Sequence, residues 1–148
     1  MRNKSVSFVL IPIAIMLIFV GIFHSAMTSG AQKPTSAETM QKREELYRLN
    51  NLGVALMEQY KHEDAVKQFK LALERDANFA VARVNLAMAD YFLNDVKAAV
   101  TEAQAALKLA PTSLHAQYVL GAAYKNARLY DAALAAFNKV LAVDAKAP

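Results

Sequence analysis

The sequence predicts an all-α protein: a solenoid of three helical hairpins preceded by one N-terminal transmembrane helix. A 34-residue pattern repeats three times without a gap over residues 46–147. Pro and Gly occur only four times each, and helix-forming residues dominate after residue 35. An uncharged apolar segment lies near the start of the chain. We therefore divide the chain into an anchor (1–30), a linker with the start of the first repeat helix (31–45), and the repeats (46–148).

The N-terminal apolar segment has the length of a membrane span. It runs from Val6 to Phe23 without a charge, and a helix of that length covers about 27 Å, close to a bilayer core of roughly 30 Å. Arg2 and Lys4 precede it, whereas the next basic residue is Lys33. Because the positive flank stays in the cytoplasm, we expect a single-pass protein whose repeats face the other side, the periplasm in a bacterium.

A cleaved signal peptide is the competing interpretation of the same segment. The small residues Ser29, Gly30 and Ala31 form a possible cleavage site before Gln32. However, the apolar stretch is longer than the usual run of about 7–15 residues. We favour the uncleaved anchor, and the alternative is an exported soluble protein cleaved near Ala31.

The linker ends at a predicted helix start. Residues 32–35 (QKPT) contain a proline, and Thr35 followed by Glu38 has the spacing of a capping box. We expect a helix from about Ser36.

The repeats occupy residues 46–79, 80–113 and 114–147, and each is expected to hold two antiparallel helices. We number the 34 places of each repeat from its first residue, which is residue 46, 80 or 114. Small residues at places eight and twenty let the two backbones approach. Larger residues at places seven, twenty-four and twenty-eight fill the space between hairpins. The coinciding residues are Leu52, Leu86 and Leu120 (place seven); Gly53, Ala87 and Gly121 (eight); Ala65, Ala99 and Ala133 (twenty); Phe69, Ala103 and Phe137 (twenty-four); and Leu73, Leu107 and Leu141 (twenty-eight).

Turn signals fall between the predicted helices. Within the hairpins we expect turns at 61–62 (KH), 94–95 (ND) and 127–128 (AR). Between hairpins we expect them at 76–78 (DAN) and 110–112 (APT).

This 34-residue pattern resembles the tetratricopeptide repeat (TPR) family. The resemblance covers residues 46–147 and implies a right-handed superhelix whose concave face holds a protein partner. The middle repeat departs most, with Arg83 and Asp90 where aromatics are expected and Ala103 in place of Phe. We expect Tyr91 and Phe92 to fill part of that volume, and the middle repeat to be the softest.

The resemblance also implies a partner-binding groove lined by the first helix of each hairpin. Such an apolar, aromatic face suits a peptide or a partner helix. Alternatively, several of its residues pack against the N-terminal helix at 36–45. The predicted groove residues are Tyr47, Asn50, Val54, Met57, Val81, Val84, Asn85, Met88, Tyr91, His115, Tyr118, Ala122 and Lys125.

A subgroup of the family grips a terminal carboxylate with Lys, Asn and Arg at fixed places. Those places hold Asn50, Val54, Asn85, His115 and Val119 in this chain, and only Asn85 matches. We therefore do not expect a carboxylate clamp.

After the last predicted helix we expect no polar capping helix of the kind that solenoids normally carry. We expect Leu134, Val140, Leu141 and Val143 to be exposed on the last helix. Self-association or docking onto a larger complex would cover them.

Composition argues against catalysis, cofactors and nucleic acid. There are no cysteines, and His24, His62 and His115 are too widely spaced for a helical metal pair. We expect His62 to lie solvated in a turn. Beyond Arg2 and Lys4, 15 of the 17 basic residues remain against 13 acidic ones, too even a balance for a nucleic-acid face. The sequence predicts a non-enzymatic, membrane-anchored scaffold, an accessory or assembly subunit of a membrane complex. The alternatives are an exported chaperone and an anchored receptor facing the cytosol.

Overall fold

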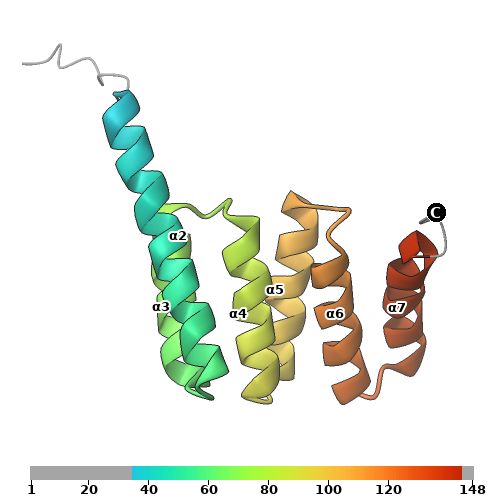
Figure 1. The fold of residues 1–148 in the computed structure, drawn as a ribbon. Coiled ribbons are helices and arrows are strands. Elements are labelled where there is room, and N and C mark those ends of the chain that lie inside the picture. The colour runs from blue at the N-terminus through green and yellow to red at the C-terminus, as the bar shows by residue number, and fades with distance from the viewer. Residues whose placement is uncertain (1–34, 145–148) are drawn as a thin grey trace, which may run out of the picture. The chain divides into compact units, whose positions relative to one another are not determined.

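The computed structural model describes residues 35–144, in which every regular element is an α-helix. The helices pack as three antiparallel hairpins in a row (Figure 1). Their bounds are α2 Ser36–Glu58, α3 His62–Arg75, α4 Ala80–Phe92, α5 Val96–Leu109, α6 Leu114–Asn126 and α7 Tyr130–Asp144.

This arrangement confirms the predicted all-helical solenoid of three hairpins. The start of α2 at Ser36 is also as predicted. The apolar segment at 6–23 and the possible cleavage site lie outside the described residues. Between residues 35 and 144, no helix is long and apolar enough to cross a membrane.

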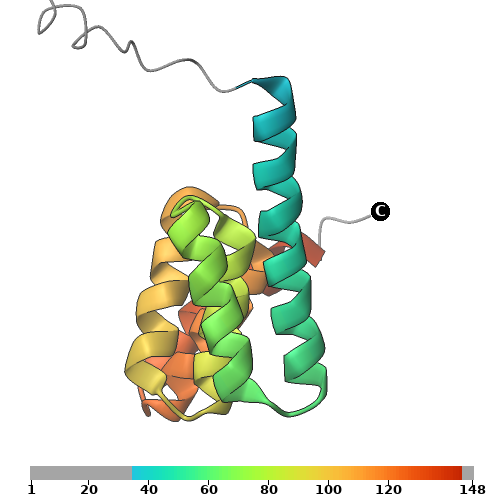
Figure 2. The same ribbon diagram turned by 90° about the vertical axis from the view of Figure 1, so that its left-hand side faces the viewer.

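The first helix is longer than the other first helices. α2 has 23 residues, whereas α4 and α6 have 13 each. The additional N-terminal turns rise beyond the neighbouring hairpins (Figure 2), and residues 36–44 are all exposed. The body of the repeat domain therefore begins near Leu46, the first buried residue of α2.

The turn within each hairpin uses a left-handed residue at the same place of the repeat. Tyr60, Asn94 and Arg128 have φ of about 60° (59°, 60° and 60°) at place fifteen. Only Asn94 belongs to a residue type that adopts this region readily. The predicted turn at 61–62 lies slightly too late, because His62 is already the first residue of α3.

Each hairpin is closed by a contact between places eight and twenty-four. A Cβ atom added to Gly53 would collide with the ring of Phe69, and one added to Gly121 would lie 2.7 Å from Cε1 of Phe137. The middle hairpin uses two alanines, Ala87 and Ala103, both fully buried. The small residue is therefore required wherever the opposite helix carries Phe.

The buried clusters of the core join neighbouring hairpins. At the α3–α4 junction, Phe69 and Ala65 pack against Leu86, which is 2% exposed. At the α5–α6 junction, Ala103 and Ala106 form a cluster with Leu120 and its neighbours. Each second helix thus packs against the next first helix, as the nearest-neighbour logic of a solenoid requires.

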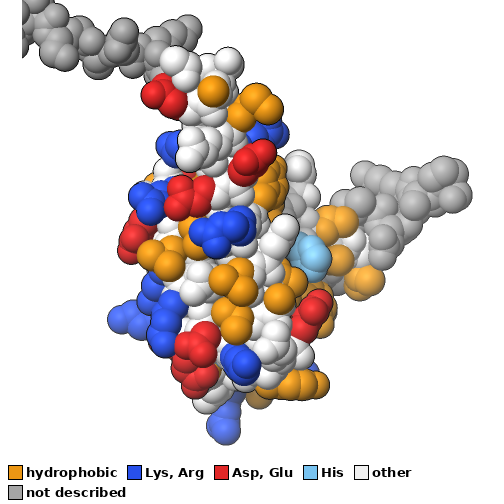
Figure 3. All heavy atoms as spheres, turned by 60° about the vertical axis from the view of Figure 1, so that its left-hand side comes forward, with side chains coloured by type: hydrophobic (Ala, Val, Ile, Leu, Met, Phe, Trp, Pro, Cys, Tyr) orange, Lys and Arg blue, Asp and Glu red, His pale blue; other side chains and the backbone are white. Residues whose placement is uncertain are grey.

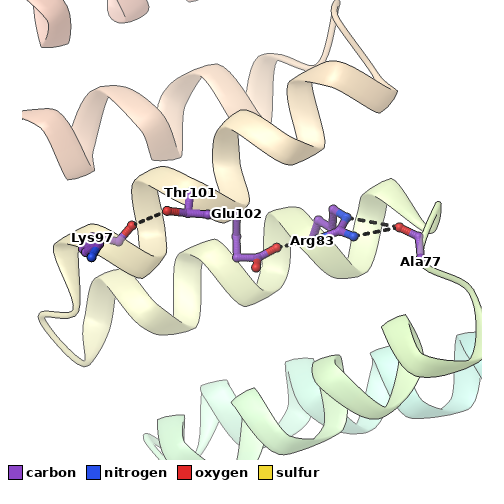
Figure 4. Close-up of polar contacts among 5 residues, drawn as sticks. All are labelled: Ala77, Arg83, Lys97, Thr101 and Glu102. Carbon is purple, nitrogen blue, oxygen red and sulfur yellow. Dashed lines mark hydrogen bonds and ion pairs between the residues drawn. The ribbon is translucent and has the colours of Figure 1, made fainter.

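The middle hairpin also carries a polar tie at place four. Arg83 donates from Nε and Nη2 to the carbonyl oxygen of Ala77 at 3.1 and 3.0 Å (Figure 4). Its Nη1 lies 2.8 Å from Oε2 of Glu102 on α5. Arg83 therefore fastens the α3–α4 loop to the hairpin at a place where the sequence pattern favoured an aromatic ring.

Candidate functional site

A groove crosses the three first helices, and we call it the α2–α4–α6 groove. It consists of two pockets of about 310 and 190 Å³ that share Val84, Asn85 and His115. Its lining residues are Val54, Met57 and Glu58 of α2; Ala80, Val81, Val84, Asn85, Met88 and Phe92 of α4; and Ala110, Ser113 and His115 around the start of α6.

Helical spacing explains why these side chains meet. On α4 the groove residues recur every three or four positions, which places them on one stripe of the helix. The same places of α2 and α6 lie beside it because the hairpins stack in register. Seven of the predicted residues line the two pockets: Val54, Met57, Val81, Val84, Asn85, Met88 and His115.

Asn50 supports the groove from beneath instead of lining it. Its side chain is 5% exposed, and its Oδ1 accepts a hydrogen bond of 2.9 Å from Nδ2 of Asn85. A buried amide without such a partner would be costly. This contact joins α2 to α4 and fixes the orientation of the Asn85 amide at the junction of the two pockets.

The other predicted residues lie outside the two pockets. Tyr47 packs edge-on against Phe79, with ring centroids 5.5 Å apart. Tyr118 is exposed and packs near Phe137 at 5.9 Å. Lys125 is exposed in the last turn of α6, whereas Ala122 is buried.

Five lining residues are absent from the sequence prediction: Glu58, Ala80, Phe92, Ala110 and Ser113. The prediction that Phe92 fills the core of the middle repeat is wrong, because its side chain is 53% exposed. Its ring stacks on His62, with centroids 5.0 Å apart and an interplanar angle of 15°. His62 is therefore not a solvated turn residue as predicted, and its Nδ1 is buried without a hydrogen-bond partner. Tyr91 is partly buried and packs edge-on against Phe92 at 5.6 Å.

The chemistry of the groove is apolar with a few neutral polar groups. Among the described residues that line its two pockets there is no Lys or Arg. Glu58 gives one carboxylate at the α2 end, and Asn85, Ser113 and His115 give hydrogen-bonding groups. Hydrophobic side chains gather in the middle of the face shown in Figure 3, and charged side chains lie mainly around them. Such a surface fits an apolar segment oriented by a small number of hydrogen bonds.

Metal binding finds no support in this part of the chain. Over residues 35–144 there is no group of three or more His, Asp and Glu side chains placed to hold a metal ion.

The third hairpin matches a known family, and the whole described unit has known structural counterparts. Residues 114–146 match the model of the tetratricopeptide repeat. A comparison with curated proteins finds no match. The second TPR of Spaghetti (RPAP3) bound to the HSP90 peptide SRMEEVD has a TM-score of 0.66 and 21% identity, over 70% of this chain and 96% of that one.

Two further structures show the same likeness. The second TPR domain of human RPAP3, in complex with the HSP70 peptide SGPTIEEVD, has a TM-score of 0.67 and 19% identity, over 72% of this chain and 88% of that one. The crystal structure of MamA has a TM-score of 0.63 and 22% identity, over 91% of this chain and 76% of that one. The described residues therefore form a TPR-type helical solenoid, and residues 114–146 match the model of a single tetratricopeptide repeat.

Proposed function

We propose that this chain is an adaptor that holds an apolar segment of a protein partner in the α2–α4–α6 groove. The observation that carries the proposal is the groove itself: two connected pockets lined by Val, Met and Phe side chains, with Asn85 at their junction. Apolar pockets provide affinity, and a small number of hydrogen bonds fixes the register of the bound segment.

The chemistry of the groove argues against acidic C-terminal peptides such as SRMEEVD, which is bound by the second TPR of Spaghetti. Such a peptide requires cationic side chains, and none lines the two pockets. Of the places at which a carboxylate clamp would hold its ligand, Val119 is fully buried and Asn50 is used by Asn85. We expect synthetic SRMEEVD to show no saturable binding in the micromolar range by fluorescence anisotropy. Saturable binding that is lost in Asn85→Ala would contradict this choice of partner.

We further propose that the chain is a membrane-anchored scaffold on the non-cytoplasmic side, an accessory or assembly subunit of a membrane complex. The support is the uncharged apolar segment Val6 to Phe23, preceded by Arg2 and Lys4. Anchoring confines the groove to the layer beside the membrane, which raises the effective concentration of membrane partners. The alternative is an exported soluble chaperone, released by cleavage near Ala31.

The test is recovery of the tagged full-length protein in mild detergent, with intact-mass analysis of the chain. A full-length mass together with one stoichiometric membrane partner supports the anchored subunit. A chain that begins at Gln32 and carries many sub-stoichiometric clients supports the exported chaperone instead.

A pair of variants tests whether the partner binds in the groove or elsewhere on the surface. Met88→Glu places a charge in the larger pocket, whereas Leu71→Glu places the same charge on α3, where Leu71 is exposed and lies outside both pockets. We expect Met88→Glu to lose the partner and Leu71→Glu to retain it. Equal recovery of the partner by wild type and Met88→Glu would rule out the groove as the binding surface.

A further inference from the structure

The last described helix, α7, leaves open the apolar stripe that α3 and α5 cover. In the first two hairpins, places twenty-one and twenty-eight are partly buried against the next first helix, as Val100 and Leu107 are in the core around α6. The corresponding residues of α7, Leu134 and Leu141, are each 61% exposed. The prediction that these two leucines are exposed is confirmed. Val140 is partly buried, and the side chain of Val143 is not among those described.

The first helix, α2, leaves open the matching half of the same junction. At place seven, Leu86 and Leu120 are buried against the preceding second helix, whereas Leu52 of α2 is 42% exposed. At place ten, Ala89 and Ala123 are fully buried, whereas Ala55 is only partly buried. Leu52 and Ala55 are more exposed than their counterparts in α4 and α6 because no second helix precedes α2 among the described residues.

The two complete junctions define the chemistry of a helix that covers a stripe such as that of α7. Both covering helices, α4 and α6, present a small residue, a leucine four positions later and a small residue three positions after that. These residues are Ala82, Leu86 and Ala89 in α4, and Ala116, Leu120 and Ala123 in α6. All six are at most 7% exposed. α2 carries the same leucine and second alanine, as Leu52 and Ala55.

We propose that α2 of a second copy of this chain docks on the open stripe of α7, so that copies associate head to tail and continue the solenoid. The two surfaces are halves of a junction that the chain already builds twice, at α3–α4 and at α5–α6. The docked junction would bury Leu52 of one copy against Leu134 and Leu141 of the next. This contact is heterologous, so it produces open chains or a closed ring instead of a twofold dimer.

One residue of α2 departs from the small–Leu–small pattern of α4 and α6, and it limits the strength of the proposed contact. Place three is a fully buried alanine in α4 and α6, but it is the exposed Arg48 in α2. A docked second copy must accommodate that side chain, and the desolvation of its charge opposes association. The proposed assembly is therefore weak and concentration-dependent, and Arg48 sets its affinity.

The head-to-tail geometry has a test that a symmetric α7–α7 contact does not share. Leu52→Glu places a charge on the α2 docking surface and leaves that of α7 intact. Leu141→Glu places a charge on the α7 docking surface and leaves that of α2 intact. We expect full-length wild type in mild detergent to increase in mass with concentration by analytical ultracentrifugation, and each variant to remain monomeric. A mixture of the two variants retains one intact surface of each kind and should form a 1:1 dimer. Leu71→Glu, with native helicity by circular dichroism, is the matched control and should associate as wild type does.

Three outcomes would overturn the proposal: a monomeric wild type, a mixture that stays monomeric, or a Leu52→Glu variant that still associates. Arg48→Ala gives an independent readout because it restores the small–Leu–small pattern on α2. We expect it to tighten the association by on the order of tenfold. An unchanged or weaker association would also contradict docking through α2.

Discussion

The outer hairpins and the middle hairpin solve the same packing problem in different ways. In α2–α3 and α6–α7 a glycine faces a phenylalanine, Gly53 against Phe69 and Gly121 against Phe137. In α4–α5 the fully buried alanines Ala87 and Ala103 replace this pair.

The middle hairpin adds polar groups at places where the repeat pattern favours aromatics. Arg83 ties the α3–α4 loop to Glu102, and Asp90 lies only 7% exposed near the end of α4. The comparison teaches that a hairpin can be closed by pairs of different size, because the two alanines together are smaller than a glycine and a phenylalanine. The outer hairpins therefore depend on apolar interlock, whereas the middle hairpin depends partly on charge.

The largest expected effect is the loss of the ring of Phe69. Phe69 is fully buried between α2, α3 and α4, so Phe69→Ala should cost about 3–5 kcal/mol of unfolding free energy. Phe137 is only partly buried because nothing described covers α7, so Phe137→Ala should cost clearly less. Urea unfolding followed by circular dichroism measures both. Equal losses would show that the exposed side of α7 is covered in solution.

The second effect is the loss of unfolding free energy caused by the buried carboxyl of Asp90 in the middle hairpin. Burial, the neighbouring charge of Asp95 and that of Glu102 raise the pKa of Asp90 to about 6, against the opposing charge of Lys70. Because this pKa lies above the 3.8 of an ordinary Asp, the folded protein holds the proton more tightly than the unfolded chain. The unfolding free energy should therefore fall as the pH rises from about 4 to about 6.

Asp90→Asn should remove this dependence and stabilise the protein above pH 6. The pKa difference sets an upper limit of about 3 kcal/mol, and access of water to the group reduces the expected gain to about 1–2 kcal/mol. Urea unfolding of wild type and variant at pH 4.5 and pH 7.5 measures the effect. A difference between the two proteins that does not change with pH would contradict the assignment.

The third effect tests the two glycine–phenylalanine pairs against each other. Gly53→Ala forces a methyl group into the fully buried ring of Phe69, whereas the ring of Phe137 opposite Gly121 has an open side. We expect Gly53→Ala to cost about 1–2 kcal/mol and Gly121→Ala to cost less. Adding Phe69→Leu to Gly53→Ala should recover part of the loss. A double variant that is as unstable as the sum of its single variants would show that the two places are not coupled.

The smallest effect concerns the ion pairs. Arg83→Met keeps the apolar stem but removes the hydrogen bonds to Ala77 and leaves Glu102 without its partner, at a cost of about 1–2 kcal/mol. The matched control is Arg75→Met, because the pair of Arg75 with Glu45 is longer, at 3.3 Å, and more exposed. We expect that change to cost less than about 0.5 kcal/mol. If both variants lose the same stability, the tie in the middle hairpin has no special role.

The sequence was sufficient to predict the hairpins because the residues that determine them are local and recur periodically. The 34-residue period and the turn residues predicted all three hairpins, and the start of α2 was predicted from its capping residues. The turn before α3 was placed too late because the left-handed residue there is Tyr60, a type that gives no turn signal.

The groove was harder to predict because side chains from different hairpins define it. Asn50 belongs to a groove place by spacing, yet its partner Asn85 on the next hairpin holds it in the interior. The stacking of His62 on Phe92 joins α3 to α4 across 30 positions of sequence, and no periodicity within one helix reports such a pair. Likewise, Arg83 satisfies a loop carbonyl whose position depends on the packing of its neighbours.

The central claim, that the chain works by holding a partner in the α2–α4–α6 groove, is tested most directly by site-specific photo-cross-linking. A photoreactive residue is placed at Met88 in the groove or at Leu71 on α3, in the full-length chain expressed in its native host. We predict one discrete cross-linked partner from Met88 and none from Leu71. Cross-links from Leu71 without any from Met88 would contradict the account and place the working surface on the second helices.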